Sequence, residues 1–168
     1  MLRLRPFKIC DINDLLGWVQ EERVFSMWCA NKFEYPLTEN QIKAYKEIYD
    51  ADERGWMFSA LDQSGKVVGH ILMRNADYEK ESIHFGFIIV DPSYRGKGYG
   101  KEMVKQALKY AFEIFHMKHA TLGVYSNNVA AHNCYKAVGF VDQEYFEDFF
   151  SYKDEKWGLY TMQVDQEK

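Results

Sequence analysis

The spacing of apolar positions predicts a short strand and then a helix at the start of the chain. Residues 2–5 alternate between apolar and basic side chains and stop at Pro6, as a short first strand does. Residues 11–24 carry apolar side chains three or four positions apart, and Asp11 or Asn13 is suited to cap this helix. One strand and one helix are therefore expected before the β-rich part of the sequence.

A second helix is predicted after an aromatic, irregular segment at residues 25–37, which Pro36 interrupts. Thr38 and Gln41 have the spacing of a capping box, in which side chains bond the free backbone N–H groups of a helix start. Apolar positions at helical spacing follow them, so we expect two helices before the first long strand.

Runs rich in β-branched and aromatic residues predict the strands of a sheet. The first two runs flank residues 62–65, a polar segment ending in glycine that is typical of a hairpin turn. The third run becomes uniformly apolar toward its end, as a buried central strand does. After residue 140, an acidic and aromatic loop is expected between two further β-like runs. The predicted strands occupy residues 56–61, 67–73, 82–90 and 121–125 and the two runs after 140.

Two more helices are predicted in the C-terminal half. Residues 98–115 carry apolar side chains along one face of a long helix. Residues 128–137 form a shorter helix that Gly139 ends. Because no repeat, low-complexity tract or linker interrupts the pattern, we expect a single domain over residues 1–168.

Composition narrows the class of protein without identifying it. Of the 168 residues, 47% are hydrophobic and 27% are charged, which is ordinary for a globular domain with its own core. The net charge of −4 argues against a nucleic-acid partner, and the mild acidity suits a cationic substrate such as an amine. No apolar run approaches the length needed to cross a membrane, so no membrane partner is expected.

The cysteines and the first residues favour a cytoplasmic protein. Cys10, Cys29 and Cys134 fit no spacing typical of a metal site or a disulfide framework, so we expect free thiols and no metal. The first residues lack the apolar core of a signal peptide. A reducing, cytoplasmic environment is therefore expected.

The most informative segment lies between a buried strand and a helix start and reads Arg95-Gly96-Lys97-Gly98-Tyr99-Gly100. Alternate glycines let the backbone turn tightly and expose successive N–H groups. The first turn of the following helix adds free donors and a partial positive charge. With the charges of Arg95, Lys97 and Lys101 close by, the segment predicts a cradle for a diphosphate group.

Spacing alone leaves alternatives for this glycine-rich segment. A P-loop needs a Gly-x-x-x-x-Gly-Lys-Ser/Thr string, which the chain does not contain. A dinucleotide fingerprint has its third glycine one residue later than Gly100 and opens a βαβ unit, whereas this strand follows a hairpin. A nucleotide-dependent enzyme and a plain turn between strand and helix are the alternatives.

Two strings taken together resemble the GNAT superfamily of N-acetyltransferases. Residues 90–100 are similar to the family's loop, which reads Arg/Gln-x-x-Gly-x-Gly/Ala and binds the pyrophosphate of coenzyme A. Residues 128–140 are similar to its second motif, in which an asparagine precedes a tyrosine by seven residues and the helix ends in Gly-Phe. The first residues are more loosely similar to the ribosomal-protein N-acetyltransferase branch, which acetylates protein N-termini as well as small amines.

The resemblance implies an α/β fold with a mixed, mostly antiparallel sheet of six or seven strands and about four helices. It also implies an enzyme that takes acetyl-CoA as acyl donor, in a V between the strand ending at Val90 and the strand at residues 121–125. Strand backbone groups would pair with the pantetheine arm and polarise the thioester carbonyl. The residues this resemblance assigns to acetyl-CoA are Ile88, Ile89, Val90, Arg95, Gly96, Lys97, Gly98, Tyr99, Gly100, Lys101, Asn128 and Asn133.

Tyr135 stands at the family's tyrosine position and is the candidate general acid. A phenol with an ordinary pKa of about 10 can protonate the coenzyme A thiolate as it leaves. Ala131, Tyr135 and Val138 also share helical spacing, so a purely structural core tyrosine is the alternative. Asn128 likewise suits both the N-cap of its helix and a contact to the pantetheine arm.

The general base that must deprotonate an ammonium substrate is left open by the motif. Some relatives place a glutamate five residues before the motif's asparagine, where this chain has Gly123. Other relatives use as base an acidic residue on the strand before the glycine-rich loop, and His84 is the nearest equivalent here. An imidazole with a pKa of about 6.5 suits proton transfer at neutral pH. Strand alternation predicts His84, Gly86 and Ile88 on one face. Glu81 and a chain of waters are the alternatives to His84.

The acyl acceptor is expected to be a small-molecule amine or a peptide N-terminus. Two aromatic and acidic patches, Trp28 with residues 33–35 and residues 144–150, can line a pocket for a cationic group. Contacts in a homodimer are the alternative use of these patches. No cysteine has a recognisable nucleophile–base arrangement, so the acetyl group is expected to pass directly to the amine in a ternary complex. A non-catalytic acyl-CoA sensor or scaffold is the alternative, since Gly123 stands where a base is expected.

Overall fold

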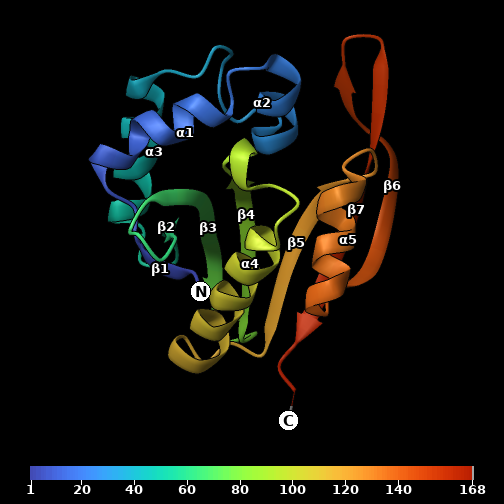
Figure 1. Ribbon diagram of the computed structural model, residues 1–168. Helices are drawn as coiled ribbons and strands as arrows, with labels where there is room; N and C mark the ends of the chain where they lie inside the picture. The colour runs from blue at the N-terminus through green and yellow to red at the C-terminus, as the bar shows by residue number, and fades with distance from the viewer. Residues whose placement is uncertain (168) are drawn as a thin grey trace.

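The computed structural model describes residues 1–167 as a seven-stranded sheet with helices on both faces (Figure 1). The strand order is β1-β2-β3-β4-β5-β7-β6, and β4 with β5 is its one parallel pair within these residues. The strands are β1 (Arg3–Pro6), β2 (Trp56–Leu61), β3 (Val67–Asp77), β4 (Ser82–Val90), β5 (His119–Tyr125), β6 (Val141–Tyr152) and β7 (Glu155–Asp165). The predicted mixed, mostly antiparallel sheet is confirmed.

Five α-helices lie in the described part of the chain, where about four were expected. They are α1 (Ile12–Trp18), α2 (Glu22–Cys29), α3 (Glu39–Ala51), α4 (Tyr99–Lys109) and α5 (Val129–Val138). α4 continues as a π-helical turn at Tyr110–Ile114. Two predicted caps are confirmed: Thr38 accepts the backbone N–H of Gln41, and Gly139 ends α5 in the left-handed conformation. The cap predicted for the first helix is wrong, because Asp11 stands at the N-cap of α1 but its carboxylate bonds Arg5 and Ser59 and makes no capping hydrogen bond to α1.

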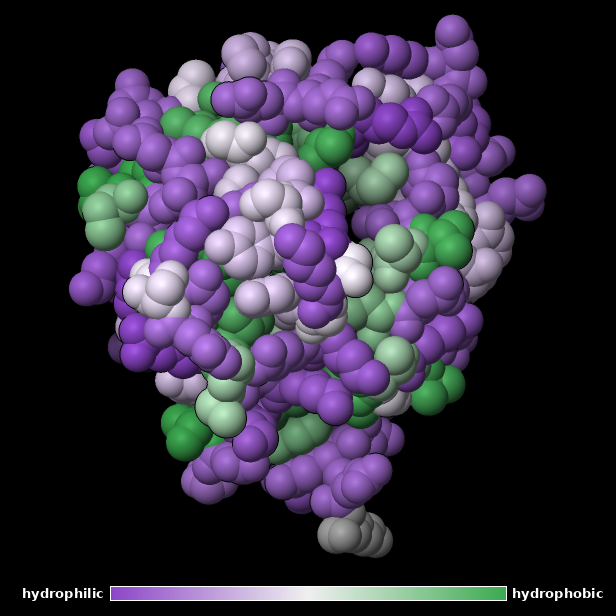
Figure 2. Space-filling view, viewed as in Figure 1, coloured by the Kyte–Doolittle hydropathy of each residue, from purple (hydrophilic) through white to green (hydrophobic). Residues whose placement is uncertain are grey.

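Two apolar clusters attach the helices to opposite faces of the sheet. α1, α2 and α3 pack in a cluster that includes Leu72 and Ile89 of the sheet. α4 and α5 pack in a second cluster, which includes Phe85 and Leu122. The surface on the side seen in Figure 2 is largely hydrophilic, with hydrophobic residues in small patches between. Among the described residues, no helix is both long and apolar enough to cross a membrane.

The helix predicted over residues 11–24 is wrong in its extent. The structure has two helices there, α1 and α2, and the second continues into the segment predicted to be irregular. The chain leaves helical geometry at Val19, where φ is −119°. This break lets both helices bury apolar side chains in the same cluster, with Leu15 from α1 and Phe25 from α2.

The acidic and aromatic segment at residues 144–150 is not the predicted loop, because it belongs to strand β6. β6 pairs with β7 through this segment, with a bulge ahead of the pair Phe150–Trp157. Asp148 takes a positive φ of 50° in that bulge. The rings of Phe150 and Trp157 contact each other, with centroids 5.3 Å apart, and such cross-strand aromatic pairs stabilise the hairpin.

Strand β4 contains a bulge at Phe87, where one extra residue faces β3 and φ is 49°. The bulge reverses the alternation of side chains along the strand. Ile88 packs in the same cluster as Phe85, and Phe87 packs in the cluster of α1, α2 and α3. The predicted common face of His84, Gly86 and Ile88 is therefore wrong.

Strands β4 and β5 pair only over their first halves. The parallel pairs begin at Ser82–His119 and end at Phe85–Leu122. β4 then runs on to Val90 and β5 to Tyr125 without a further pair between them in residues 1–167. The two strands then diverge and leave an opening between them, where the V-shaped cleft was expected.

Candidate active site

Two adjoining cavities occupy the opening between β4 and β5. The loop cavity, of about 530 Å³, is bounded by the glycine-rich loop, the end of β4 and α5. The sheet cavity, of about 430 Å³, is bounded by β3, β4, β5 and α2 with side chains of β6 and β7. The residues that line both cavities are Met27, Trp28, Ile88, Asn128 and Tyr135. A ligand in one cavity can therefore contact a ligand in the other.

The glycine-rich loop adopts backbone conformations that favour glycine. Gly96 and Gly98 have φ values of 71° and 84°, in the left-handed region. A Cβ added at either residue would meet nothing within 4 Å, so space remains beside the backbone. Gly98 is also the N-cap of α4, which brings the free N–H groups of that helix start to the loop. Room and backbone donors together fit the diphosphate of acetyl-CoA.

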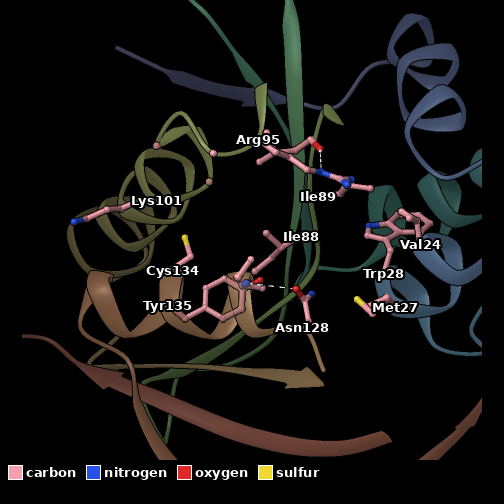
Figure 3. Close-up of a pocket in the computed structure, with 16 residues that line it drawn as sticks. Val24, Met27, Trp28, Ile88, Ile89, Arg95, Lys101, Asn128, Cys134 and Tyr135 are labelled. Carbon is pink, nitrogen blue, oxygen red and sulfur yellow. Dashed lines mark hydrogen bonds between the residues drawn. The ribbon is translucent and has the colours of Figure 1, made fainter. Parts of the chain in front are cut away.

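Two of the three basic side chains predicted at this loop line the loop cavity. Arg95 Nε donates to the carbonyl of Val90 at 3.2 Å, so its side chain lies along the end of β4 (Figure 3). Lys101, in the first turn of α4, is the second. Lys97 instead donates from Nζ to the carbonyl of Ser93 at 2.9 Å and lies outside the cavity wall.

The structure brings nine of the twelve residues assigned to acetyl-CoA into the wall of the loop cavity. They are Ile88, Ile89, Val90, Arg95, Gly96, Gly98, Gly100, Lys101 and Asn128. Like Lys97, the remaining two lie outside it. The ring of Tyr99 packs edge-on against Tyr94 with centroids 5.0 Å apart, and Asn133 is exposed on α5.

Tyr135 lies on α5 (Figure 3) and lines both cavities, which places it at their junction. Its side chain is 7% exposed and packs edge-on against Phe140, with ring centroids 6.2 Å apart. Burial raises the pKa of the Tyr135 phenol well above its ordinary value. The hydroxyl is therefore protonated at neutral pH and can donate a proton at the junction.

Asn128 has the predicted N-cap role and also lies beside the cavities. Its Oδ1 accepts the backbone N–H of Ala131 at 3.4 Å and so caps α5 (Figure 3). Its side chain also borders both cavities. Since the cap uses Oδ1, the amide nitrogen is left for a ligand.

His84 lines the sheet cavity from β4, and its Nδ1 lies 2.9 Å from Oγ1 of Thr121 on β5. Burial, followed by the charge of Arg74, lowers the pKa of His84 to about 4. The imidazole is therefore neutral at pH 7. Glu81, the alternative base, forms an ion pair with Lys118 and lies outside both cavity walls.

Two cysteines reach the cavities, but neither is an activated nucleophile. Cys29 lines the sheet cavity, and burial raises the pKa of its thiol to about 12. Cys134 lines the loop cavity, and burial also raises its pKa. Both thiols are protonated at neutral pH, and a thiol in that form is a poor nucleophile.

The acidic pocket expected for a cationic amine is absent from the described residues. Trp28 and Phe149, one from each predicted patch, do line the sheet cavity. The carboxylates of those patches are exposed and lie outside the wall; they belong to Glu34, Glu144, Glu147 and Asp148. The charged side chains that do line the cavity are basic, Lys32 and Arg74.

Sequence reasoning missed part of the cavity walls. The missed residues include Met27, Lys32, Arg74, Thr121, Cys134 and Thr161. Arg74 carried one signal, because it is a charged residue directly after the apolar run at residues 67–73. Its position opposite His84 depends on the pairing of β3 with β4, which spacing along the chain does not reveal.

The sheet with its diverging β4 and β5, and the glycine-rich loop beside them, define a transferase that uses an acyl-coenzyme A donor. The chain belongs to the acetyltransferase (GNAT) domain family, whose model matches residues 1–141. It is an N-acetyltransferase, and its donor is acetyl-CoA.

Curated relatives include proteins named for different small molecules. The spermidine N(1)-acetyltransferase of Vibrio cholerae is 28% identical over 166 residues, which cover 96% of this chain and 93% of the relative. The enzyme of that name in Escherichia coli (strain K12) is 25% identical over 150 residues, 89% of this chain and 78% of the relative. The N-acetylaspartate synthetase of Xenopus tropicalis is 32% identical over 94 residues, 56% of this chain and 34% of the relative.

Solved structures share the fold. The crystal structure of spermidine N-acetyltransferase from Vibrio cholerae in complex with CoA and spermine has a TM-score of 0.87 to this chain at 22% identity. The match covers 98% of this chain and 95% of that one. A dodecameric structure of the same enzyme in an intermediate state gives a TM-score of 0.81, also at 22% identity, over 98% and 94% of the two chains.

Proposed function

We propose that this chain transfers the acetyl group of acetyl-CoA directly to a primary amine, with donor and acceptor bound together. The observation that carries the proposal is the junction of the loop cavity and the sheet cavity at Tyr135. The raised pKa values of Cys29 and Cys134 argue against an acetylated enzyme intermediate.

The loop cavity is the proposed donor site. Acetyl-CoA supplies an activated acetyl thioester there. The backbone of Gly96 and Gly98 binds its diphosphate, and Arg95 and Lys101 add positive charge. The backbone of residues 88–90 lies at the diverging edge of β4 and binds the pantetheine arm as an added strand.

Tyr135 is the proposed general acid. Its hydroxyl is protonated at neutral pH and delivers its proton to the sulfur of coenzyme A as that sulfur leaves. The transfer releases coenzyme A as a neutral thiol and leaves a tyrosinate, which regains a proton from solvent before the next turnover. Asn128, at the other end of the same helix, orients the donor through its amide nitrogen.

His84 is the proposed acceptor of the proton that the ammonium substrate must lose. Thr121 holds its Nδ1, which fixes the plane of the ring. With a pKa of about 4, the protonated imidazole is short-lived and passes its proton on to solvent. A chain of waters without His84 is the alternative route.

The acceptor is proposed as a small-molecule amine, with a peptide N-terminus as the alternative. The relatives are named for spermidine and for N-acetylaspartate, which leaves the acceptor of this chain open. The test is release of coenzyme A from acetyl-CoA in the presence of spermidine, amino acids or short peptides. At least one amine should raise the release rate above that in buffer, and a panel with no active amine would contradict the proposal.

The proposal extends to the whole chain and its setting. The sheet continues through β7 to Asp165, beyond residues 1–141 of the family match, which supports one domain over residues 1–168. The three cysteines are free, and acetyl-CoA is the donor, which supports a cytoplasmic location. The dodecameric relative supports a homo-oligomer, with a homodimer as its smallest form. Sedimentation analysis tests the oligomer, and a purely monomeric protein would contradict it.

A further inference from the structure

Arg74 is held in the wall of the sheet cavity by its neighbours on the sheet. It stands on β3 opposite His84 of β4. Its side chain lies over Gly86, where an added Cβ would be in ordinary van der Waals contact with Arg74 Nε, at 3.7 Å. The guanidinium carbon lies 5.6 Å from the centroid of the Phe87 ring, a cation–π contact. The guanidinium is therefore positioned and not free to move in solvent.

The charge of Arg74 has no partner in residues 1–167. No ion pair or hydrogen bond of its side chain is present there, and its Nε is buried without a partner. Other arginines are paired: Arg5 bonds Asp11 at 2.6 Å, and Arg23 bonds Glu155 at 2.5 Å. A partly buried guanidinium costs free energy unless an anion compensates it. A ligand bound in the sheet cavity can supply the negative charge that compensates Arg74.

No other group facing the sheet cavity, among the described residues, supplies a negative charge. Its ionisable wall residues besides Arg74 are Cys29, Lys32, His84, Tyr125 and Tyr135. Burial keeps the thiol and both phenols protonated, because it raises their pKa values. Two carboxylates outside the wall are taken up in ion pairs, Glu22 with Lys153 at 2.9 Å and Glu155 with Arg23. A polycation would therefore meet two positive side chains in this cavity.

We infer that the acceptor is a primary amine that also carries a carboxylate, and that Arg74 binds this carboxylate. The planar fork of a guanidinium matches the two carboxylate oxygens with parallel N–H···O bonds. Anchored at Arg74, the acceptor lies in the same cavity that Tyr135 borders. This inference rests on the proposed function and narrows its acceptor from any primary amine to an amino acid or a related amino carboxylate.

Matched pairs of amines that differ by one carboxylate test the acceptor class. The pairs are phenylalanine with phenethylamine and lysine with cadaverine. Spermidine serves as the polycation. Phosphoethanolamine, compared with ethanolamine, tests whether a phosphate on the acceptor is preferred instead of a carboxylate. For the wild-type protein we expect kcat/KM to be about 10- to 100-fold higher for the carboxylated member of a pair, as for hydrogen bonds to a charged group.

Variants of Arg74 test its role. Arg74→Gln should lower kcat/KM for the carboxylated amine by about 10- to 100-fold, mainly through KM, and change the decarboxylated amine less than about twofold. Arg54→Gln is the matched control, because it removes the same charge at an exposed site outside both cavities. Unchanged affinity for acetyl-CoA, measured by calorimetry, shows that Arg74→Gln is folded.

The outcomes separate the two proposals. The inferred carboxylate on the acceptor is overturned if the protein prefers the decarboxylated amine, spermidine or phosphoethanolamine alone. The proposed acetyl transfer is not affected by that result. An equal loss on both members of a pair in Arg74→Gln also overturns it. If Arg74→Gln does not bind acetyl-CoA, Arg74→Lys is the test variant, because lysine keeps the positive charge without the planar fork of the guanidinium. Arg74→Lys should lose part of the preference for the carboxylated amine. The same preference as in the wild-type protein would overturn the inference. A protein that binds acetyl-CoA and acetylates no amine contradicts the proposed function itself.

Discussion

Tyr135 shows how much a single side chain depends on its surroundings here. Helical spacing is consistent with both a core tyrosine and a catalytic one, and the residue is indeed buried. What distinguishes it from an ordinary core residue is that it borders the loop cavity and the sheet cavity together. Its phenol would be protonated at neutral pH even with the ordinary pKa of about 10, and burial raises that pKa further.

Removing the Tyr135 hydroxyl should slow turnover without weakening donor binding. Tyr135→Phe keeps the ring that packs against Phe140, so the fold and the loop cavity are retained. We expect kcat to fall by roughly 10²- to 10⁴-fold, as for other lost acid–base groups, with the acetyl-CoA affinity from calorimetry unchanged. Tyr110→Phe, outside both cavities, is the control. A variant with normal kcat would remove Tyr135 from the mechanism.

At the scale of elements, the end of β4 and the start of α4 create the proposed donor site. The pairing of β4 with β5 ends at Phe85, just before the bulge at Phe87, and the glycine-rich loop then leads directly into the start of α4. The free strand edge and the free helix start are thus consecutive along the chain. This is why one continuous segment, residues 88–101, holds eight of the nine predicted residues that line the loop cavity.

A side chain on the loop should weaken acetyl-CoA binding. Gly98→Val introduces a Cβ at a φ of 84°, which costs roughly 1–2 kcal/mol, and fills the space beside the loop backbone. Gly65→Val is the matched control, because Gly65 has a φ of 86° in the turn between β2 and β3 and does not line the loop cavity. Both variants should lose similar stability in thermal unfolding.

Only Gly98→Val should lose affinity for acetyl-CoA, by at least about tenfold in calorimetry, which corresponds to about 1.4 kcal/mol. If the two valine variants bound the donor equally well, the loop would not be the diphosphate site.

At the scale of the whole molecule, the sheet order assembles the acceptor side from distant parts of the chain. Arg74, His84, Thr121 and Thr161 come from four strands, and the sheet brings these strands together as β3, β4, β5 and β7. The resulting cavity is basic although the chain as a whole carries a net charge of −4. Net charge is therefore a poor guide to the charge of the substrate.

The same packing should make the fold sensitive to mild acid. Burial lowers the pKa of His70 to about 3 and that of His84 to about 4, both below the ordinary value. Between those values and about 6.5, the unfolded chain binds more protons, so stability falls as pH decreases through this window. Each histidine contributes a slope of up to about 1.4 kcal/mol per pH unit.

The melting temperature should therefore change little above pH 7 and fall between pH 6.5 and 4.5. The double variant His70→Asn, His84→Gln should have a flatter profile in the same range. Asp11 does not confuse the test, since its pKa is lowered to about 2 and its contribution is lost only at more acidic pH. A wild-type melting temperature that stayed constant down to pH 4.5 would contradict this account.

The sequence by itself determined the family, the donor and most of the sheet. Local rules are enough for these features. Alternating and helical periods of apolar residues predict strands and helices, and the left-handed backbone of the loop at residues 95–100 favours glycine. Residues adjacent in sequence at the end of β4 and the start of α4 remain adjacent in space. The donor-binding segment could therefore be recognised from the chain alone.

Only the tertiary structure decided the acceptor side. The bulge at Phe87, the break between α1 and α2, and the pairing of residues 144–150 into β6 all depend on contacts with other elements. So does the unpaired charge of Arg74, because pairing between strands cannot be read from the spacing of residues in one of them. The proposed donor site follows local sequence, whereas the proposed acceptor site follows the order of strands in the folded sheet.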